Sequence, residues 1–263
     1  MRRRVGLLVL AGLTVLAGCS TFVSPSASTE TVTPAPVPAA TTSTAEAGGP
    51  LPPGLTGGGV TDVGSLASAH LDTIRNRSYT WQAHTYFGET NSTQTLKVEA
   101  PRHYTYQDAG RGSRINTSDF ADGETVYTRY HRFVERLRRA PAPNATDQYG
   151  PLAAKAIERY LAVENATVAE TLVGGERHYL VRTEMDRYPA IEGATNYSVE
   201  AVIAPDGFVR ELTVSYVNRG GTRPLPVRYH YRYDRVGTTT ISEPTWFTDD
   251  EWATNPTETA SGR

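Results

Sequence analysis

Cys19 is the only cysteine in this chain of 263 residues, and its surroundings suit covalent attachment of a lipid. Arginines at positions 2–4 precede an uncharged apolar run from Val5 to Ala17, and Gly18 and Cys19 follow directly. A charged start, a short apolar run and small residues before a cleavage point make up a signal peptide, and this run is too short to remain as a spanning helix. A buried free cysteine or an uncleaved anchor fits this context less well. We therefore expect residues 1–18 to be removed and Cys19 to carry a membrane lipid, which places the protein at the cell membrane, facing outside.

A second set of candidate modification sites points to the same location. Six of the eight asparagines begin an Asn-x-Ser/Thr triplet, the acceptor of N-linked glycans. Asparagine and hydroxyl residues also occur together in turns, which is the alternative explanation. Because six triplets exceed the number that a random order gives, we favour glycosylation, at a density more usual in archaea than in bacteria. The candidates are Asn76, Asn91, Asn116, Asn144, Asn165 and Asn196; we expect Asn91, Asn116 and Asn144 to lie in turns and to be modified most readily.

Enzymatic chemistry finds little support in the remaining residues. The sequence has no Gly-x-Ser-x-Gly motif, no His-Glu-x-x-His motif and no phosphate-binding glycine loop. Glu184 and Asp186, two residues apart, are a candidate acid/base pair, but neighbouring carboxylates at a strand end are ordinarily just solvated. The six histidines do not pair at metal-ligand spacing, and each is expected on a strand surface or a helix face: His70, His84, His103, His131, His178 and His230. We therefore expect no catalytic residue, no metal site and no cofactor.

Charge excludes another class of partner. The formal net charge is −2, and removal of the three arginines at positions 2–4 takes it to −5. Nucleic-acid-binding proteins are usually basic, so nucleic acid is not an expected partner.

One cluster of positive charge, residues 129–139, has two interpretations. As a helix, this stretch would place the arginines on one stripe and the apolar residues on the other, a pattern suited to a membrane surface. The apolar residues are Tyr130, Phe133, Val134 and Leu137. As a pair of strands, it would simply carry solvated arginines. We favour the strand pair.

Composition divides the chain behind the signal peptide into three parts. Residues 19–59 are rich in Ser, Thr, Pro and Gly and offer few side chains to bury, so we expect an extended, lipidated tether. Residues 60–248 are long enough for one sizeable core. Residues 249–263 are acidic and polar and are expected to form a disordered tail.

Within the central part, hydrophobic period separates helices from strands. A helix is expected from Asp62 to about Arg75, with Asp62 as its N-cap. A second is expected from Pro151 to Val163, with the proline in its first turn. Period-two segments rich in Tyr, Val and Thr predict strands near 78–87, 92–100, 102–107, 113–118, from about 124, 167–173, 177–185, 197–204, 208–217, 227–234 and 238–247.

The alternation is strictest from Val227 to Asp234, where apolar or aromatic residues alternate with charged ones. Such a pattern is typical of an antiparallel sheet that is covered on one side only. About ten strands in hairpin order, with one helix before them and one inserted, predict an α+β fold. We expect a large curved antiparallel sheet, an incomplete barrel, with the helices on its concave face.

These features give the chain a resemblance to a known group of proteins. The lipobox at Cys19, the opening helix that leads into Ser78-Tyr79-Thr80, and the hairpin around Pro205-Asp206-Gly207 resemble the LolA/LolB-type lipoprotein carriers and the mycobacterial lipid-binding lipoproteins. Lipoproteins of unknown function from halophilic archaea look more similar still. The resemblance covers about 60–248, and it implies an apolar cavity between sheet and helices that holds an acyl or isoprenoid chain.

Two functions therefore remain open at the level of sequence. In the first, the protein binds a lipid or other hydrophobic ligand, because two short helices leave much of a broad apolar face to be covered. The residues expected to line that cavity are Leu212, Val214, Tyr216, Val227, Tyr229, Tyr231 and Tyr233. In the second, the sheet packs a solid core and the protein is a non-enzymatic surface-interaction or structural lipoprotein.

Overall fold

The computed structural model describes residues 49–111, 116–131 and 135–248. The described elements belong to one unit, residues 43–263. The predicted signal peptide, Cys19 and the predicted acidic tail lie outside the described residues.

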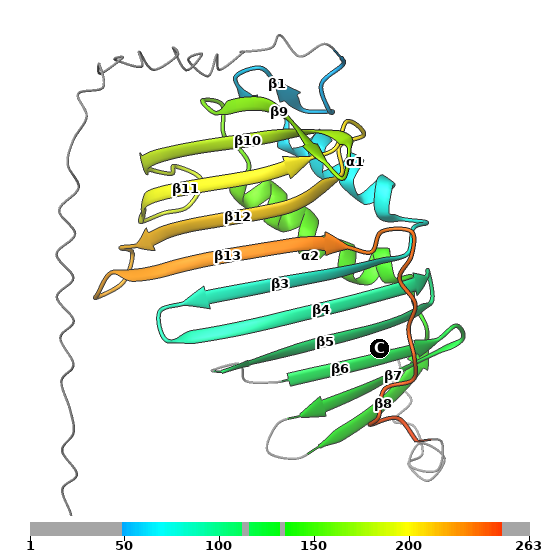
Figure 1. Cartoon of the computed structure of the whole chain (residues 1–263). Helices are drawn as coiled ribbons and strands as arrows, with labels where there is room; N and C mark the ends of the chain where they lie inside the picture. The colour runs from blue at the N-terminus through cyan, green and yellow to red at the C-terminus, as the bar shows by residue number, and fades with distance from the viewer. Residues whose placement is uncertain (1–48, 112–115, 132–134, 249–263) are drawn as a thin grey trace, which may run out of the picture. The chain divides into compact units, whose positions relative to one another are not determined.

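Eleven strands form one antiparallel sheet, in the spatial order β8-β7-β6-β5-β4-β3-β13-β12-β11-β10-β9 (Figure 1). Strands β8 and β9 are its two edges, so the sheet is not closed. The α+β fold with a large, open antiparallel sheet is thereby confirmed. In chain order the strands are β3 (Tyr79–Phe87), β4 (Thr90–Ala100), β5 (His103–Arg111), β6 (Asn116–Asp122), β7 (Thr125–His131), β8 (Arg136–Pro141), β9 (Thr167–Val173), β10 (Glu176–Arg187), β11 (Ala194–Ile203), β12 (Val209–Asn218) and β13 (Leu225–Asp234).

Neighbouring strands are sequence neighbours everywhere except at the centre, where β13 pairs with β3. The register there sets Tyr233 opposite Trp81 and Tyr231 opposite Ala83. This pairing joins the hairpins of β3–β8 to those of β9–β13 and makes one continuous sheet.

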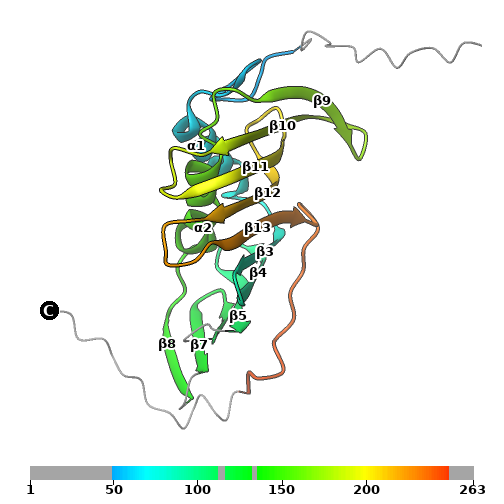
Figure 2. The ribbon, with the colours of Figure 1, turned by 90° about the vertical axis from the view of Figure 1, so that its left-hand side faces the viewer.

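Both helices lie on the same face of the sheet (Figure 2). Helix α1 (Val63–Ile74) begins at Asp62, whose side chain accepts a hydrogen bond from the Ser65 amide at 2.9 Å, as predicted. Helix α2 (Ala145–Tyr160) contributes the buried side chains of Tyr149, Ile157 and Tyr160 to the core between the helices and the sheet. The sheet therefore has one face under helices and one face open to other contacts.

The second helix begins earlier than predicted, which is a correction. Its N-cap is Asn144, and Pro151 lies inside the helix and not in its first turn. Proline cannot donate to the carbonyl four residues earlier and normally ends a helix there. Here burial of Thr146, Tyr149 and Gly150 on the inner side stabilises the first turns despite that loss.

Two further expectations need correction. Residues 238–247 form no strand; this segment crosses the helix-free face, where Thr239 and Thr80 share a hydrogen bond of 3.1 Å and Phe247 packs on Phe120 (Figures 1 and 2). Residues 49–59, expected within the tether, are packed: β1 (Leu55–Thr56) and β2 (Gly59–Val60) pair with each other, and the amide of Val60 donates to the Val163 carbonyl at 2.8 Å. The folded part thus extends before residue 60.

The arginine cluster adopts the strand-pair interpretation. Strands β7 and β8 are antiparallel, with Thr128 opposite Arg138 and Tyr130 opposite Arg136. Residues 132–134, which include the Phe133 of the helical interpretation, lie outside the described residues.

Candidate functional site

The seven predicted cavity residues lie together on the helix-covered face of β12 and β13. Their register sets Leu212 opposite Tyr231, Val214 opposite Tyr229, and Tyr216 opposite Val227. Six of the seven are buried and Tyr229 is partly buried. Period-two alternation therefore identified the correct face.

Aromatic side chains form a layer between this face and the helices. Tyr229 packs on Tyr160 of α2, with ring centroids 5.3 Å apart, and Tyr231 packs on Trp81 at 6.3 Å. Tyr233 contacts Tyr79 at 5.2 Å. The layer continues across β4 and β5 to Tyr104 and Tyr106, which both pack on Tyr149 of α2.

His70 of α1 closes one end of this layer. It is fully buried, and its ring stacks on Phe208 with centroids 5.5 Å apart. Its Nδ1 accepts a hydrogen bond from the Val209 amide at 3.2 Å, so the ring proton sits on Nε2, which donates to the Tyr233 hydroxyl at 3.1 Å. Burial lowers the pKa of His70 to about 3, and the ring is neutral at ordinary pH.

Four polar atoms inside the aromatic layer have no hydrogen-bond partner among the described residues. They are the hydroxyls of Tyr79, Tyr104 and Tyr231 and the indole Nε1 of Trp81. Burial raises the pKa of each of these tyrosines, so all three stay protonated. An unpaired buried donor costs about 1–3 kcal/mol, and buried polar groups in proteins nearly always have partners.

Three pockets of the described part lie elsewhere. Their volumes are about 330, 380 and 630 Å³, and none of the three is lined by any of the seven predicted cavity residues. Those seven side chains pack against their neighbours.

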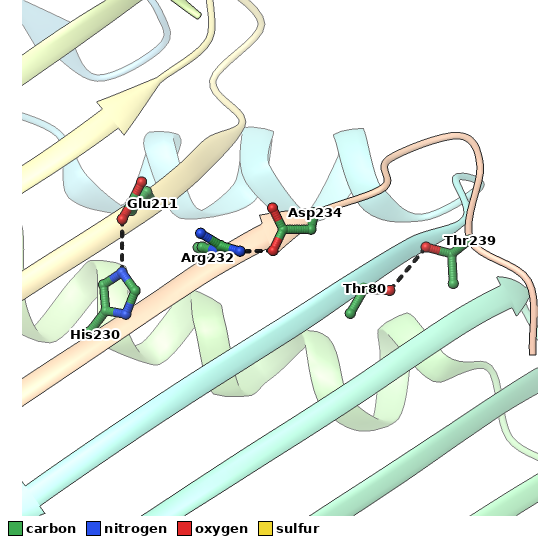
Figure 3. Close-up of polar contacts among 6 residues, drawn as sticks. All are labelled: Thr80, Glu211, His230, Arg232, Asp234 and Thr239. Carbon is green, nitrogen blue, oxygen red and sulfur yellow. Dashed lines mark hydrogen bonds and ion pairs between the residues drawn. The ribbon is translucent and has the colours of Figure 1, made fainter. Parts of the chain in front are cut away.

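On β12 and β13 the helix-free face is polar, as the alternation predicted. His230 contacts Glu211 at 2.8 Å, Arg232 contacts Asp234 at 2.7 Å, and Thr80 contacts Thr239 (Figure 3). His84 stacks on His230, with ring centroids 6.4 Å apart. The charged members of this group are a third or more exposed, as solvated surface side chains usually are.

The candidate glycosylation sites differ in position from what was expected. Asn91 lies in β4, Asn116 lies in β6, and Asn144 caps α2, so none of these three is in a turn. The side-chain oxygen of Asn91 accepts from the Arg111 amide at 3.1 Å, and that of Asn144 accepts from the Thr146 amide at 2.8 Å. The exposed candidates in the described part are Asn76, Asn91, Asn165 and Asn196.

Sequence reasoning missed one buried carboxyl, Asp119 of β6. It is 5% exposed, and its Oδ2 accepts a hydrogen bond from the Tyr149 hydroxyl of α2. The predicted strand ended at residue 118, which left Asp119 outside it. A continued alternation of Thr117, Asp119 and Ala121 would have set Asp119 on the inner face, but its burial depends on α2.

Groups suited to a metal ion are absent from the described ranges: no three His, Cys, Asp or Glu side chains come together there. In the same residues no helix has the length and apolar character needed to cross a membrane.

Comparison with known proteins adds little to this geometry. No protein-family model matches the sequence, and no curated protein matches it. Among solved structures, the chain is similar to the LolA superfamily protein NE2245 from Nitrosomonas europaea, with 10% sequence identity and a TM-score of 0.24. The match covers 71% of this chain and 97% of that one. A TM-score of this size decides neither the ligand nor the family, so function has to be inferred from this chain's own side chains.

Proposed function

We propose that this protein is a lipid-anchored protein of the outer face of the cell membrane that binds a lipid or other hydrophobic ligand between its sheet and helices. The observation that supports ligand binding is the aromatic layer with four unpaired polar atoms. A solid core of this kind would leave each donor unsatisfied, whereas a mostly apolar ligand with a few polar groups would pair with some of them.

The ligand's place in this proposal is defined by two sets of side chains. Val214 and Tyr229 supply apolar contact on adjacent strands. Tyr231 and Trp81, which pack on each other, supply the donors. Entry of a chain-like molecule requires α2 to move away from the sheet, because Tyr160 packs on Tyr229.

The first experiment measures uptake of a fluorescent acyl probe by the purified full-length protein after lipid extraction. Val214→Trp should abolish uptake by filling the space that the probe needs. Thr213→Trp is the matched control, because Thr213 is exposed on the opposite face of the same strand. Equal uptake by both variants, or no uptake by the wild type, would refute the proposal.

A second candidate function is a surface-interaction or structural lipoprotein with a solid core. It is favoured by the burial or partial burial of the seven predicted cavity residues and by the position of three pockets away from them.

Removal of a single hydroxyl separates the two candidates. If a ligand pairs with Tyr231, Tyr231→Phe should weaken probe binding by about 2- to 10-fold, as the loss of one ordinary hydrogen bond does. If the core is solid, the same variant should bind nothing and should be more stable to denaturant, because an unpaired hydroxyl is gone. Tyr197→Phe is the control: it removes a hydrogen bond to the Tyr160 carbonyl and should destabilise the protein in both cases.

A further inference from the structure

The helix-covered face changes character from aromatic to polar towards β8. Along one row across the strands, Tyr106 of β5 is opposite Asp119 of β6, which is opposite Thr128 of β7, which is opposite Arg138 of β8. Residues that are opposite one another on neighbouring strands share a face. The row therefore sets a buried acid, a hydroxyl and a basic side chain on one surface.

A pocket of about 330 Å³ opens over this row. Its walls include Thr117, Asp119, Thr128 and Tyr130 of β6 and β7, Arg138 of β8, and Gln148 of α2. This volume is at the lower end of the range for small-molecule sites.

Asp119 is the negative pole of the pocket. The side chain is 5% exposed, its Oδ2 accepts from the Tyr149 hydroxyl, and its Oδ1 has no hydrogen-bond partner among the described residues. Burial raises the pKa of this carboxyl, more than the neighbouring hydroxyls of Tyr149 and Thr128 lower it. A buried carboxylate oxygen without a donor is costly, so the site favours a ligand that brings a positively charged donor.

A second acid strengthens this preference. Asp108 of β5 lies on the same face, opposite Thr117 of the pocket wall. Its Oδ2 accepts from the Gln94 side-chain amide at 3.1 Å, and its buried Oδ1 also has no partner in the described part. Two unpaired carboxylate oxygens on adjacent strands attract a cation.

Arg138 is the positive pole and sits at the rim. It is exposed, and no ion pair involves its guanidinium among the described residues. Two steps across an antiparallel sheet separate the backbones of Asp119 and Arg138 by about 10 Å, and their side chains span part of that gap. A guanidinium binds carboxylate or phosphate groups in a bidentate manner.

We propose that this pocket binds a small zwitterion, with its primary ammonium on Asp119 and its acidic group on Arg138. Phosphoethanolamine and short amino acids have this arrangement. The same chemistry comes from a free small molecule or from the headgroup of a phospholipid. The inference does not rest on the proposed hydrophobic ligand, since it concerns polar residues beyond the aromatic layer.

The probe for testing the pocket is phosphoethanolamine, titrated calorimetrically into the purified full-length protein. Phosphocholine is the matched control probe, because it carries the same charges but has no N–H donor. We expect phosphoethanolamine to bind and phosphocholine to bind about 10- to 100-fold more weakly, the usual effect of losing a hydrogen bond to a charged group. Vesicles of phosphatidylcholine with and without phosphatidylethanolamine then distinguish a lipid headgroup from a free molecule.

Variants assign the two poles. Asp119→Asn and Arg138→Gln should each weaken phosphoethanolamine binding by about 10-fold or more. Asp186→Asn and Arg139→Gln remove equal charges elsewhere and should leave it unchanged. Asp119→Asn should also raise thermal stability, because it removes a buried charge. If Asp119→Asn does not fold, binding of phosphoethanolamine by the surface variant Arg138→Gln still tests the proposal. Three results would each overturn the proposal. The first is no binding heat with either phosphoethanolamine or vesicles that contain phosphatidylethanolamine. The others are equal affinity for phosphocholine and phosphoethanolamine, and unchanged phosphoethanolamine binding by Arg138→Gln.

Discussion

His70 shows how a residue that looks like a surface histidine becomes a structural one. The sequence predicts it on a helix face, and it does lie on α1, but Phe208 and Tyr233 enclose it. Both ring nitrogens have partners, Val209 on one side and Tyr233 on the other. The neutral ring, with one hydrogen bond on each nitrogen, holds α1 against β12 and β13. Because both nitrogens are occupied, the ring is unsuited to binding a metal.

The buried ring makes stability depend on pH in a defined window. The unfolded ring takes up a proton near pH 6.5, and the folded ring does so only near pH 3. The contribution of the neutral ring is therefore complete above pH 6.5 and is lost as the pH falls towards 3, by about 1.4 kcal/mol for each pH unit.

His70→Asn should remove this dependence. Measured by urea unfolding between about pH 7 and pH 4, the variant should be less stable than the wild type at pH 7 but should lose less stability on acidification, because its side chain does not titrate. His84→Asn on the helix-free face should keep the wild-type slope. Parallel slopes for wild type and His70→Asn would show that the folded ring takes up its proton as readily as the unfolded one, so that burial does not lower its pKa.

At the scale of single residues, the sequence predicted which face of the sheet a side chain lies on better than what packs against that side chain. The seven residues on β12 and β13 follow a strict alternation that any half-covered sheet imposes, so they could be assigned to the inner face. Whether that face encloses a ligand or a packed layer depends on where α2 lies, which is a long-range property. Asp119 was missed for the same reason, since only its contact with Tyr149 of α2 marks it as buried.

Helix α2 shows where element boundaries escape prediction. Pro151 is a strong local signal for the start of a helix, and it was interpreted as one. The helix actually starts at Ala145, and its N-cap Asn144 accepts a hydrogen bond from the Thr146 amide. Buried Thr146 and Tyr149 extend the helix in front of the proline, a case in which tertiary packing overrides local preference.

Asn144→Ala tests the cap directly. In protein made without glycosylation, the variant should lose about 1 kcal/mol of unfolding free energy, because a helix amide loses its acceptor. Asn76→Ala, at an exposed position in a turn, should change stability by less than about 0.5 kcal/mol. Equal and small effects in chemical denaturation would mean that Asn144 contributes little as a cap.

At the scale of the whole molecule, the hairpins could be predicted and their junction could not. Strands β9 to β13 follow one another with short turns, such as Pro205-Asp206-Gly207, and local turn chemistry specifies them. The pairing of β3 with β13 joins strands that are far apart in the sequence. No local pattern encodes it, and it is this pairing that makes one sheet out of two sets of hairpins.

Glycan occupancy tests the outward-facing location. Asn76, Asn91, Asn165 and Asn196 are exposed and should be the first to carry glycans, whereas partly buried Asn116 and Asn144 should be modified less. Intact-mass and glycopeptide analysis of protein purified from its native host measures each site. Native protein without a glycan on any of the six asparagines would contradict the expectation.

The membrane anchor is the prediction on which the proposed location depends. Cys19 is the chain's only cysteine, and it follows the only stretch with the form of a signal peptide. One acyl chain holds a protein to a bilayer only marginally, so stable anchoring requires a modification that presents two chains. Cys19→Ser should therefore move the protein from the membrane fraction to the soluble fraction or leave the precursor uncleaved, while Ser20→Ala should stay with the membrane. Mass spectrometry of the wild-type N-terminus should find the chain beginning at a lipid-modified Cys19. Retention of Cys19→Ser in the membrane, together with an unprocessed wild-type N-terminus, would show that residues 1–18 serve as the anchor themselves.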